Sequence, residues 1–227
     1  VLAIAGPNSR RLLGAVTDAD LSDDAFPPYR MRHTHISHAP VFAQRLSFTG
    51  ETGWEIFVTP DFAEHVLEII LKAGQPLGLR LAGGEALNAL RIEKGFLHWG
   101  ADMAYTEAPY QLGLDFICKP SKTLPFIGQD ACLARKADPK GPFLRSVRLA
   151  DPDAILHHNE PVLRDGQIIG FVTSGAFCAM QKAAVGLCLV SPPDGAGGFE
   201  AVDDGPCSVM VEGREVPAEL RRKPFGA

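Results

Sequence analysis

Hydrophobic and polar positions in the first 95 residues follow two periods, that of a strand and that of a helix. Alternating apolar residues predict strands, and apolar residues three or four positions apart predict amphipathic helices. Gly6-Pro7 ends the first apolar run, and Asn8 and Asp61 stand where helix caps are expected. The predicted elements are a strand over 1–5, a helix over about 9–16, hairpin strands over 41–48 and 54–58, a helix over about 62–73, and a helix between Gly84 and Gly95. The polar, proline-rich stretch 17–32 is predicted as loop with at most a short helix.

The pattern changes after about residue 140, where short apolar runs alternate with Asp, Gly and Pro turns. This spacing is typical of a small barrel or sandwich. The linker is predicted at 136–142, which divides the chain into domains at 1–140 and 141–227. The order of elements before the linker favours an α+β fold, a partial antiparallel sheet with covering helices. The strand-like runs are 143–149, 161–163, 167–173, 183–190, 199–202 and 207–211, and 192–198 is predicted as a surface loop.

Composition and charge exclude several classes of protein. The chain has 227 residues, of which 46% are hydrophobic and 22% charged, which is typical of a globular protein with a packed core. A net charge of -5 provides no broad cationic face for nucleic acid. No apolar run reaches the roughly 20 residues of a membrane helix. We therefore expect neither nucleic acid nor membrane as a partner.

Cysteine and histidine residues give little support to a metal site. The five cysteines are widely spread without a Cys-x-x-Cys pair, which predicts reduced structural thiols in a reducing compartment, and hence a cytoplasmic protein. His33, His35 and His38 are closely spaced, but no acidic or thiol ligand clusters with them. We expect an exposed loop or an irregular strand there, and no metal.

Glu55 and Arg91 are the first candidates for binding chemistry. Glu55 lies in an otherwise apolar strand after the Gly50–Gly53 turn, and Arg91 lies on the helix that follows. A carboxylate and a guanidinium on neighbouring elements suggest a pocket. The alternatives are that Glu55 faces water and that Arg91 forms an ion pair with an acid.

Other side chains have a structural interpretation beside the functional one. Phe48 and Trp54 either wall a flat heterocycle or belong to the core. Asp102 is expected to cap a turn, and Thr173-Ser174-Gly175 to be a strand and its turn. Glu93 and Lys94 are predicted on a solvated helix face.

An ordered set of short motifs resembles the tetrahydrofolate-binding aminomethyltransferase family, the T-protein of the glycine cleavage system. The closest variants are the carboxyl-terminal portions of dimethylglycine and sarcosine dehydrogenases and oxidases. The motifs are Leu2-Ala3-Ile4-Ala5-Gly6-Pro7, Phe48-Thr49-Gly50-Glu51, Gly53-Trp54-Glu55-Ile56, Leu90-Arg91-Ile92-Glu93-Lys94-Gly95, Trp99-Gly100-Ala101-Asp102, Phe126-Ile127-Gly128, Asp165-Gly166, Ile169-Gly170, Val172-Thr173-Ser174-Gly175, Val216-Pro217-Ala218 and Pro224-Phe225.

The resemblance implies a folate-binding domain followed by a small all-β barrel, and a one-carbon transfer from glycine or an N-methyl amine to tetrahydrofolate. It implies that Glu55 accepts hydrogen bonds from the amino-pyrimidine edge of the pterin. Arg91 is then expected near the p-aminobenzoyl or glutamate end, with Phe48 and Trp54 as candidate contacts. Related chains often carry Tyr at Phe48, and Gln111 replaces a glutamate common in the family, which weakens an acid role there.

The upstream aspartate that assists transfer in the family has no match in this sequence, so no catalytic residue is assigned. No Gly-x-Gly-x-x-Gly turn for a dinucleotide is present either. The expected partners are a small-molecule amine or aminomethyl donor, and a partner chain or a fused flavin-dependent oxidoreductase. The alternative functions are a catalytically inactive folate-binding or interaction module that needs a partner or a missing N-terminal segment, and a folate-dependent demethylase.

Overall fold

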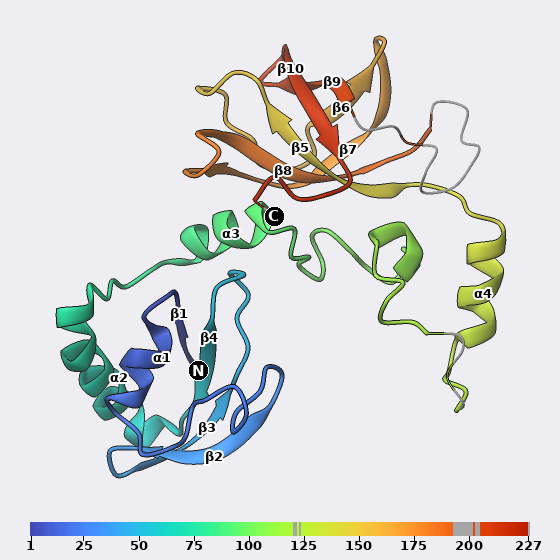
Figure 1. The fold of residues 1–227 in the computed structure, drawn as a ribbon. Helices are drawn as coiled ribbons and strands as arrows, with labels where there is room; N and C mark the ends of the chain where they lie inside the picture. The colour runs from blue at the N-terminus through green and yellow to red at the C-terminus, as the bar shows by residue number, and fades with distance from the viewer. Residues whose placement is uncertain (120–121, 123, 193–201, 203–204, 227) are drawn as a thin grey trace. The chain divides into compact units, whose positions relative to one another are not determined.

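The computed structural model describes residues 1–119, 122, 124–192, 202 and 205–226 (Figure 1). The chain forms two compact units, Val1–Leu87 and Asn88–Ala227. Each unit has its own hydrophobic core and is described by itself. Within the described residues, no helix is long and apolar enough to cross a membrane.

A four-stranded antiparallel sheet forms the centre of the first unit, in the order β1-β4-β3-β2. Its central pairing joins β4 to β1 on one side and to β3 on the other, with Glu55 opposite both Ala3 and Gln44. The predicted hairpin is therefore present, and a further strand pairs with it where a loop or irregular strand was expected. The strands are β1 (Leu2–Ala5), β2 (Met31–Ile36), β3 (Ala39–Gln44) and β4 (Gly53–Phe57).

Two helices supply apolar side chains to one core with this sheet, α1 (Ser9–Gly14) and α2 (Pro60–Gly74), and α2 continues into the 3-10 turn η1 (Gln75–Leu77). Side chains at helical spacing explain why α2 packs along its length. The core contains Ile4, Leu12, Leu13, Phe26, Ile36, Val41, Ala43, Trp54, Ile56, Val66 and Ile70.

The ends of two predicted elements differ from the structure. Helix α2 starts at Pro60 with Thr59 as its cap residue, so Asp61 lies in the first turn, where its charge favours the helix dipole. Strand β3 ends at Gln44, because the backbone of Arg45 pairs with Tyr29 and Arg30 instead of continuing along β4.

Helix α3 (Gly84–Glu93) spans the boundary between the units. In the second unit it is followed by the 3-10 turn η2 (Pro109–Leu112), by α4 (Gln129–Ala137) and by a closed antiparallel barrel, coloured yellow to red in Figure 1. The strand order around the barrel is β10-β5-β8-β7-β6-β9. The barrel strands are β5 (Phe143–Leu149), β6 (Pro161–Arg164), β7 (Gln167–Cys178), β8 (Ala183–Val190), β9 (Gly205–Val211) and β10 (Arg214–Arg221).

The barrel interior is packed with inward-facing apolar side chains from all six strands. Four predicted runs correspond to β5, β6, β7 and β8, and the run at 207–211 lies within β9. Strand β10 was missed because Pro217 interrupts an already mixed sequence of charged and apolar residues. The predicted run 199–202 and the loop 192–198 fall mainly outside the described residues.

The fold class is confirmed: an antiparallel sheet with helices is followed by a closed barrel. The domain boundary between residues 140 and 141 stays a prediction. It lies beside the Gly141-Pro142 peptide bond, which is cis, directly before β5.

Candidate functional site

Glu55 lies on the side of the sheet opposite to the core of the first unit. Its neighbours on β4, Trp54 and Ile56, are fully buried in that core. Because successive side chains of a strand point to opposite faces, Glu55 shares the other face with Ala3 and Gln44, which stand directly opposite it on β1 and β3. The side chain is half-buried. Among the described residues, no hydrogen bond to its carboxylate is found.

The same face of the sheet carries aromatic side chains. Phe57 stands opposite Phe42, which is 41% exposed, and the ring of His33 lies with its centroid 3.7 Å from that of Phe42. A half-buried carboxylate, which accepts hydrogen bonds, beside aromatic rings suits a flat heterocycle with an edge of N–H groups.

Trp54 lies on the core side of β4. Its side chain is 0% exposed, with the edge of Phe26 at 6.4 Å between ring centroids. The guanidinium groups of Arg10 and Arg45 lie 5.8 and 5.6 Å from its ring centroid. Both arginines also form ion pairs with Asp23, so a cluster of three charged side chains lies beside the indole. Trp54 therefore supports the strand that presents Glu55, and a role in direct ligand contact stays a prediction that this burial disfavours.

Phe48 lies half-buried in the segment that connects β3 to β4. Local contacts order this segment: the hydroxyls of Ser47 and Thr49 lie 2.9 Å apart, and the carbonyl of Thr52 accepts from the Gly6 N–H and the Ser9 hydroxyl. Gly53 is required at the start of β4, because a Cβ there would lie 2.6 Å from the Ile4 carbonyl oxygen. Phe48 is thus presented by an ordered turn, and its ligand contact stays a prediction.

Arg91 belongs to the second unit and is 2% exposed. Its Nη1 donates to the Asp102 carboxylate and, at 3.1 Å, to the Phe96 carbonyl. Its Nε donates to the Asn88 side chain at 2.9 Å, and its Nη2 to the Ser174 hydroxyl at 2.6 Å. The predicted alternative of an ion pair with an acid therefore holds in the structure, with Asp102 as the partner.

Asp102 joins three parts of the second unit. It is completely buried, and its carboxylate accepts from the His98 N–H at 2.9 Å and from the Thr173 hydroxyl at 2.6 Å, besides Arg91. The register of β7 against β8 shifts between Val172 and Ser174. A bulge of this kind re-aims side chains, and here the consecutive Thr173 and Ser174 both reach the same buried network.

This network limits what Arg91 can offer to a ligand. A guanidinium has five N–H donors, and four are engaged by Asn88, Phe96, Asp102 and Ser174. One Nη2 hydrogen is left without a partner among the residues that the structure describes. The network was missed from sequence because its members come from a helix, a turn and a strand, and Arg91 and Ser174 alone are 83 residues apart.

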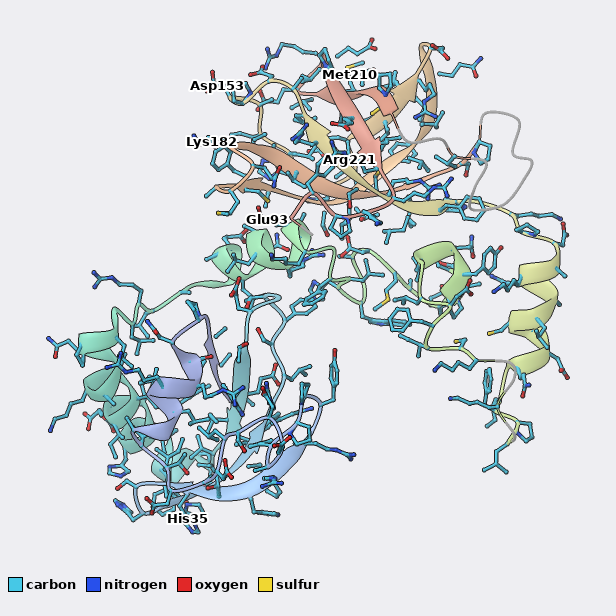
Figure 2. The ribbon with its side chains drawn as sticks, viewed as in Figure 1. His35, Glu93, Asp153, Lys182, Met210 and Arg221 are labelled. Atoms are coloured by element: carbon cyan, nitrogen blue, oxygen red, sulfur yellow. The ribbon has the colours of Figure 1, made fainter. Side chains whose placement is uncertain are left out.

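Glu93 was predicted on a solvated face, and that prediction was wrong. Its side chain is 4% exposed, and its Oε1 has no hydrogen-bond partner within the described part of the chain. Residues near the C-terminus pack against Glu93 and bury it. The Gly226 N–H donates to the Glu93 carbonyl at 3.0 Å, and Lys94 Nζ donates to the Gly226 carbonyl at 2.9 Å. Figure 2 shows Glu93 at the C-terminal end of α3, beside the last residues of the chain.

Gln111 ties η2 to the segment that enters the barrel. Its Oε1 accepts from the Ala108 N–H at 2.7 Å, and its Nε2 donates to the carbonyls of Lys140 and Pro142, each at 3.0 Å. An amide can both accept and donate here, which a carboxylate could not do. A groove of about 440 Å³ lies alongside, lined by Thr106, Glu107, Tyr110, Gln111, Ala134, Arg135, Asp138, Lys140, Gly141 and Pro142.

Family comparison agrees with this architecture. Residues 1–122 match the GCVT N-terminal domain, and residues 144–226 match the glycine cleavage T-protein C-terminal barrel domain. The chain belongs to the glycine cleavage T-protein family. The resemblance inferred from the ordered motifs is confirmed, including the likeness to dimethylglycine and sarcosine dehydrogenases and to aminomethyltransferases.

Two relatives are much longer proteins that match this chain over part of their length. A 4-methylaminobutanoate oxidase (formaldehyde-forming) from Paenarthrobacter nicotinovorans is 39% identical over 99% of this chain and 26% of its own length. The mitochondrial dimethylglycine dehydrogenase of Rattus norvegicus is 40% identical over 81% of this chain and 22% of its own length. The chain therefore spans about a quarter of the length of these relatives.

A solved structure supports the fold. The glycine cleavage system aminomethyltransferase T from Bartonella henselae superposes with a TM-score of 0.70, at 21% identity, over 82% of this chain and 49% of that protein. At this level of identity the likeness concerns the fold.

Proposed function

We propose that this chain is the folate-binding and barrel portion of an aminomethyltransferase-type protein, which transfers a one-carbon unit from glycine or an N-methyl amine to tetrahydrofolate. Family membership and the fold support the general class. The observation that carries the proposal is the half-buried carboxylate of Glu55 on the face of the sheet opposite to the core, with the aromatic side chains of Phe42 and Phe57 on the same face.

Glu55 suits the pterin end of a folate. The amino-pyrimidine edge of the pterin has adjacent N–H groups, and a carboxylate can accept two of them in a bidentate pair. Partial burial lowers competition from water, so this pair would fix the orientation of the ring. The aromatic side chains of Phe42 and Phe57 on the same face, which sequence reasoning missed, are suited to contact the flat ring.

The remaining predicted residues take different roles in the proposal. Phe48 would contact the ligand from the turn before β4, and Trp54 would hold β4 in place from the core side. Arg91 would contribute one N–H at most to the p-aminobenzoyl or glutamate end, because its other donors are engaged within the protein.

The proposal also includes the compound that donates the one-carbon unit and the enzyme that generates this donor. An amine or aminomethyl compound would supply the carbon, and an oxidoreductase, fused or separate and using a flavin, would generate it. The names of the oxidase and dehydrogenase relatives favour an N-methyl amine. We also propose a cytoplasmic location, which the five free cysteines favour. A catalytically inactive folate-binding or interaction module is the second candidate, because no catalytic residue is assigned within this sequence.

Replacement of the carboxylate tests the site directly. Glu55→Gln keeps the shape of the side chain but removes the charge, and the loss of a charge-assisted pair of about 1.5–3 kcal/mol corresponds to a roughly 10- to 100-fold rise in Kd for tetrahydrofolate. Titration calorimetry measures this Kd, and thermal unfolding of the unliganded variant should match the parent. Glu51→Gln, an exposed residue of the preceding turn, is the matched control and should leave Kd unchanged.

Equal affinity of the Glu55→Gln variant and the parent would remove Glu55 from the site. Transfer and binding are then separated by following 5,10-methylenetetrahydrofolate formation from an N-methyl amine, with the oxidoreductase portion supplied. Folate binding without transfer under those conditions would favour the inactive module over the enzyme.

A further inference from the structure

Two cysteines that are far from any Cys-x-x-Cys spacing meet at the surface of the second unit. Cys132 lies on α4, and Cys118 lies in the turn-rich segment before it. Both side chains are partly exposed, and the Cys132 thiol is near enough to Cys118 to contribute to raising its pKa.

An independent contact places the same two surfaces together. Lys136, one helical turn after Cys132, pairs with Asp115 at 3.2 Å between Nζ and Oδ2. Residues four positions apart lie on one face of a helix, so this ion pair turns the face that carries Cys132 toward the Asp115–Cys118 turn. The Ile117 N–H donates to the Leu114 carbonyl, which orders that turn.

The other cysteines are placed differently. Cys178 and Cys188 are 1% and 0% exposed, and each thiol donates to a backbone carbonyl, that of Ala89 and of Arg145 respectively. Burial raises the pKa of Cys207 to about 11. Among the described residues, Cys118 and Cys132 alone form a pair of thiols with access to solvent.

We propose that Cys118 and Cys132 form a dithiol that peroxide oxidises to an intramolecular disulfide, which clamps α4 to the preceding turn. The proposal does not depend on the proposed folate chemistry. Helix α4 supplies Ala134 and Arg135 to the lining of the 440 Å³ groove, and Arg135 Nη1 donates to the carbonyl of Thr106, another lining residue, at 3.1 Å. The disulfide would therefore tether the helix that contributes these two residues to the groove.

The reaction has two steps with hydrogen peroxide as the oxidant. One thiolate attacks a peroxide oxygen, the O–O bond breaks, and a sulfenic acid and hydroxide are formed. The second thiolate attacks the sulfenic sulfur, the S–S bond forms, and the S–O bond breaks with loss of a second hydroxide. Two electrons pass from the sulfurs to the peroxide, and the two protons released by the thiols convert the two hydroxides to water.

The pH dependence of this oxidation follows from the environment of Cys118. Desolvation, with the neighbouring Cys132 thiol as a further cause, raises the pKa of Cys118 above its usual value. The thiolate is the reacting form, so disulfide formation should be slow at neutral pH and become faster as the pH rises.

Peptide mapping of the full chain tests the proposal. The protein is treated with hydrogen peroxide, remaining thiols are alkylated, and trypsin cleaves after Lys122, which separates the two cysteines. The expected product is a linked pair of peptides containing Cys118 and Cys132, lighter than their sum by two hydrogen atoms and lost on reduction. Cys118→Ser and Cys132→Ser should each abolish the linked species, and Cys207→Ser, the matched control, should retain it.

Several results would overturn the proposal. These are a disulfide that involves Cys178, Cys188 or Cys207 instead, a disulfide between two chains, or conversion of Cys118 to sulfinic acid without a linked peptide. Circular dichroism of each serine variant confirms that loss of the link does not reflect unfolding.

Discussion

Arg91 on α3 and Asp102 in the turn after it form an ion pair in which neither side chain is more than 2% exposed. Removal of two charges from water is costly, and it is offset here because Asp102 accepts from His98 and Thr173 while Arg91 donates to Ser174. The pair therefore joins the C-terminal part of α3 to strand β7 of the barrel, through the hydrogen bonds of Arg91 to Ser174 and of Thr173 to Asp102.

Loss of either partner should destabilise the protein strongly. Arg91→Met leaves the Asp102 charge buried without its cation, and Asp102→Asn leaves the guanidinium without its anion. Each variant should lose about 3–5 kcal/mol of unfolding free energy, measured by urea denaturation. The double variant should lose less than the sum of the two, with a coupling energy of about 1–3 kcal/mol.

The exposed pair Lys140–Asp138 is the control for this cycle. Its side chains are 75% and 76% exposed at an N–O distance of 3.1 Å. The same double-mutant cycle there should give a coupling below about 1 kcal/mol. Equal coupling energies for the two pairs would contradict the role assigned to burial.

Local patterns in the sequence predicted most elements of the fold. Helix α2 and strands β5 to β8 follow from apolar spacing within each segment, because their own side chains form the core. The burial of Trp54 and the outward position of Glu55 on β4 follow from the period of a strand, once the position of the core is known. The ordered motifs identified the family before any contact was known.

Contacts between distant segments explain what the sequence did not reveal. Glu93 has the polarity of a surface residue and is buried because Gly226, 133 positions later, closes over it. The pairing of Arg91 with Asp102 depends on a turn and on a bulge in β7. The Cys118–Cys132 contact depends on how α4 packs. None of these contacts leaves a periodic signal in the chain.

Close approach of two barrel strands makes Gly170 irreplaceable. A Cβ at this position would lie 2.0 Å from the Leu189 carbonyl oxygen and 2.7 Å from the Val190 Cα, both backbone atoms of β8. Gly170→Ala should cost at least about 1–3 kcal/mol, since the paired strands must separate. Gly83→Ala, which has nothing within 4 Å, should change stability by less than about 1 kcal/mol in the same denaturant titration. A tolerated Gly170→Ala would contradict the tight β7–β8 packing.

Phe225 should anchor the C-terminal residues to the second unit. This residue is 8% exposed, and the guanidinium groups of Arg148 and Arg221 lie 4.9 and 4.7 Å from the centroid of its ring. Its carbonyl accepts from Gln181 at 2.9 Å. Phe225→Ala should lower the unfolding free energy by about 3 kcal/mol, through lost burial and lost cation–π contacts. Hydrogen exchange should also become faster at Gly226 and along the C-terminal turn of α3.

Phe177→Ala provides the comparison, because this side chain is 58% exposed on β7. Its effect should stay within about 0.5 kcal/mol. If both variants lost the same stability, the C-terminal residues would not act as an anchor.

Cys178 should make stability fall at alkaline pH. Desolvation, with the nearby Glu93 charge as a second cause, raises the pKa of this thiol from 9.0 to about 12. Between these values the unfolded chain releases the thiol proton and the folded chain keeps it. The unfolding free energy should therefore decrease with pH above 9, by up to about 1.4 kcal/mol per pH unit from this group.

Cys178→Ala should remove this part of the slope of unfolding free energy against pH, measured by denaturant titrations between pH 9 and 11. Val185→Ala, from the same apolar cluster, should lower stability at every pH and leave the slope as it is in the parent. An unchanged slope in Cys178→Ala would show that the folded chain releases this proton as readily as the unfolded one.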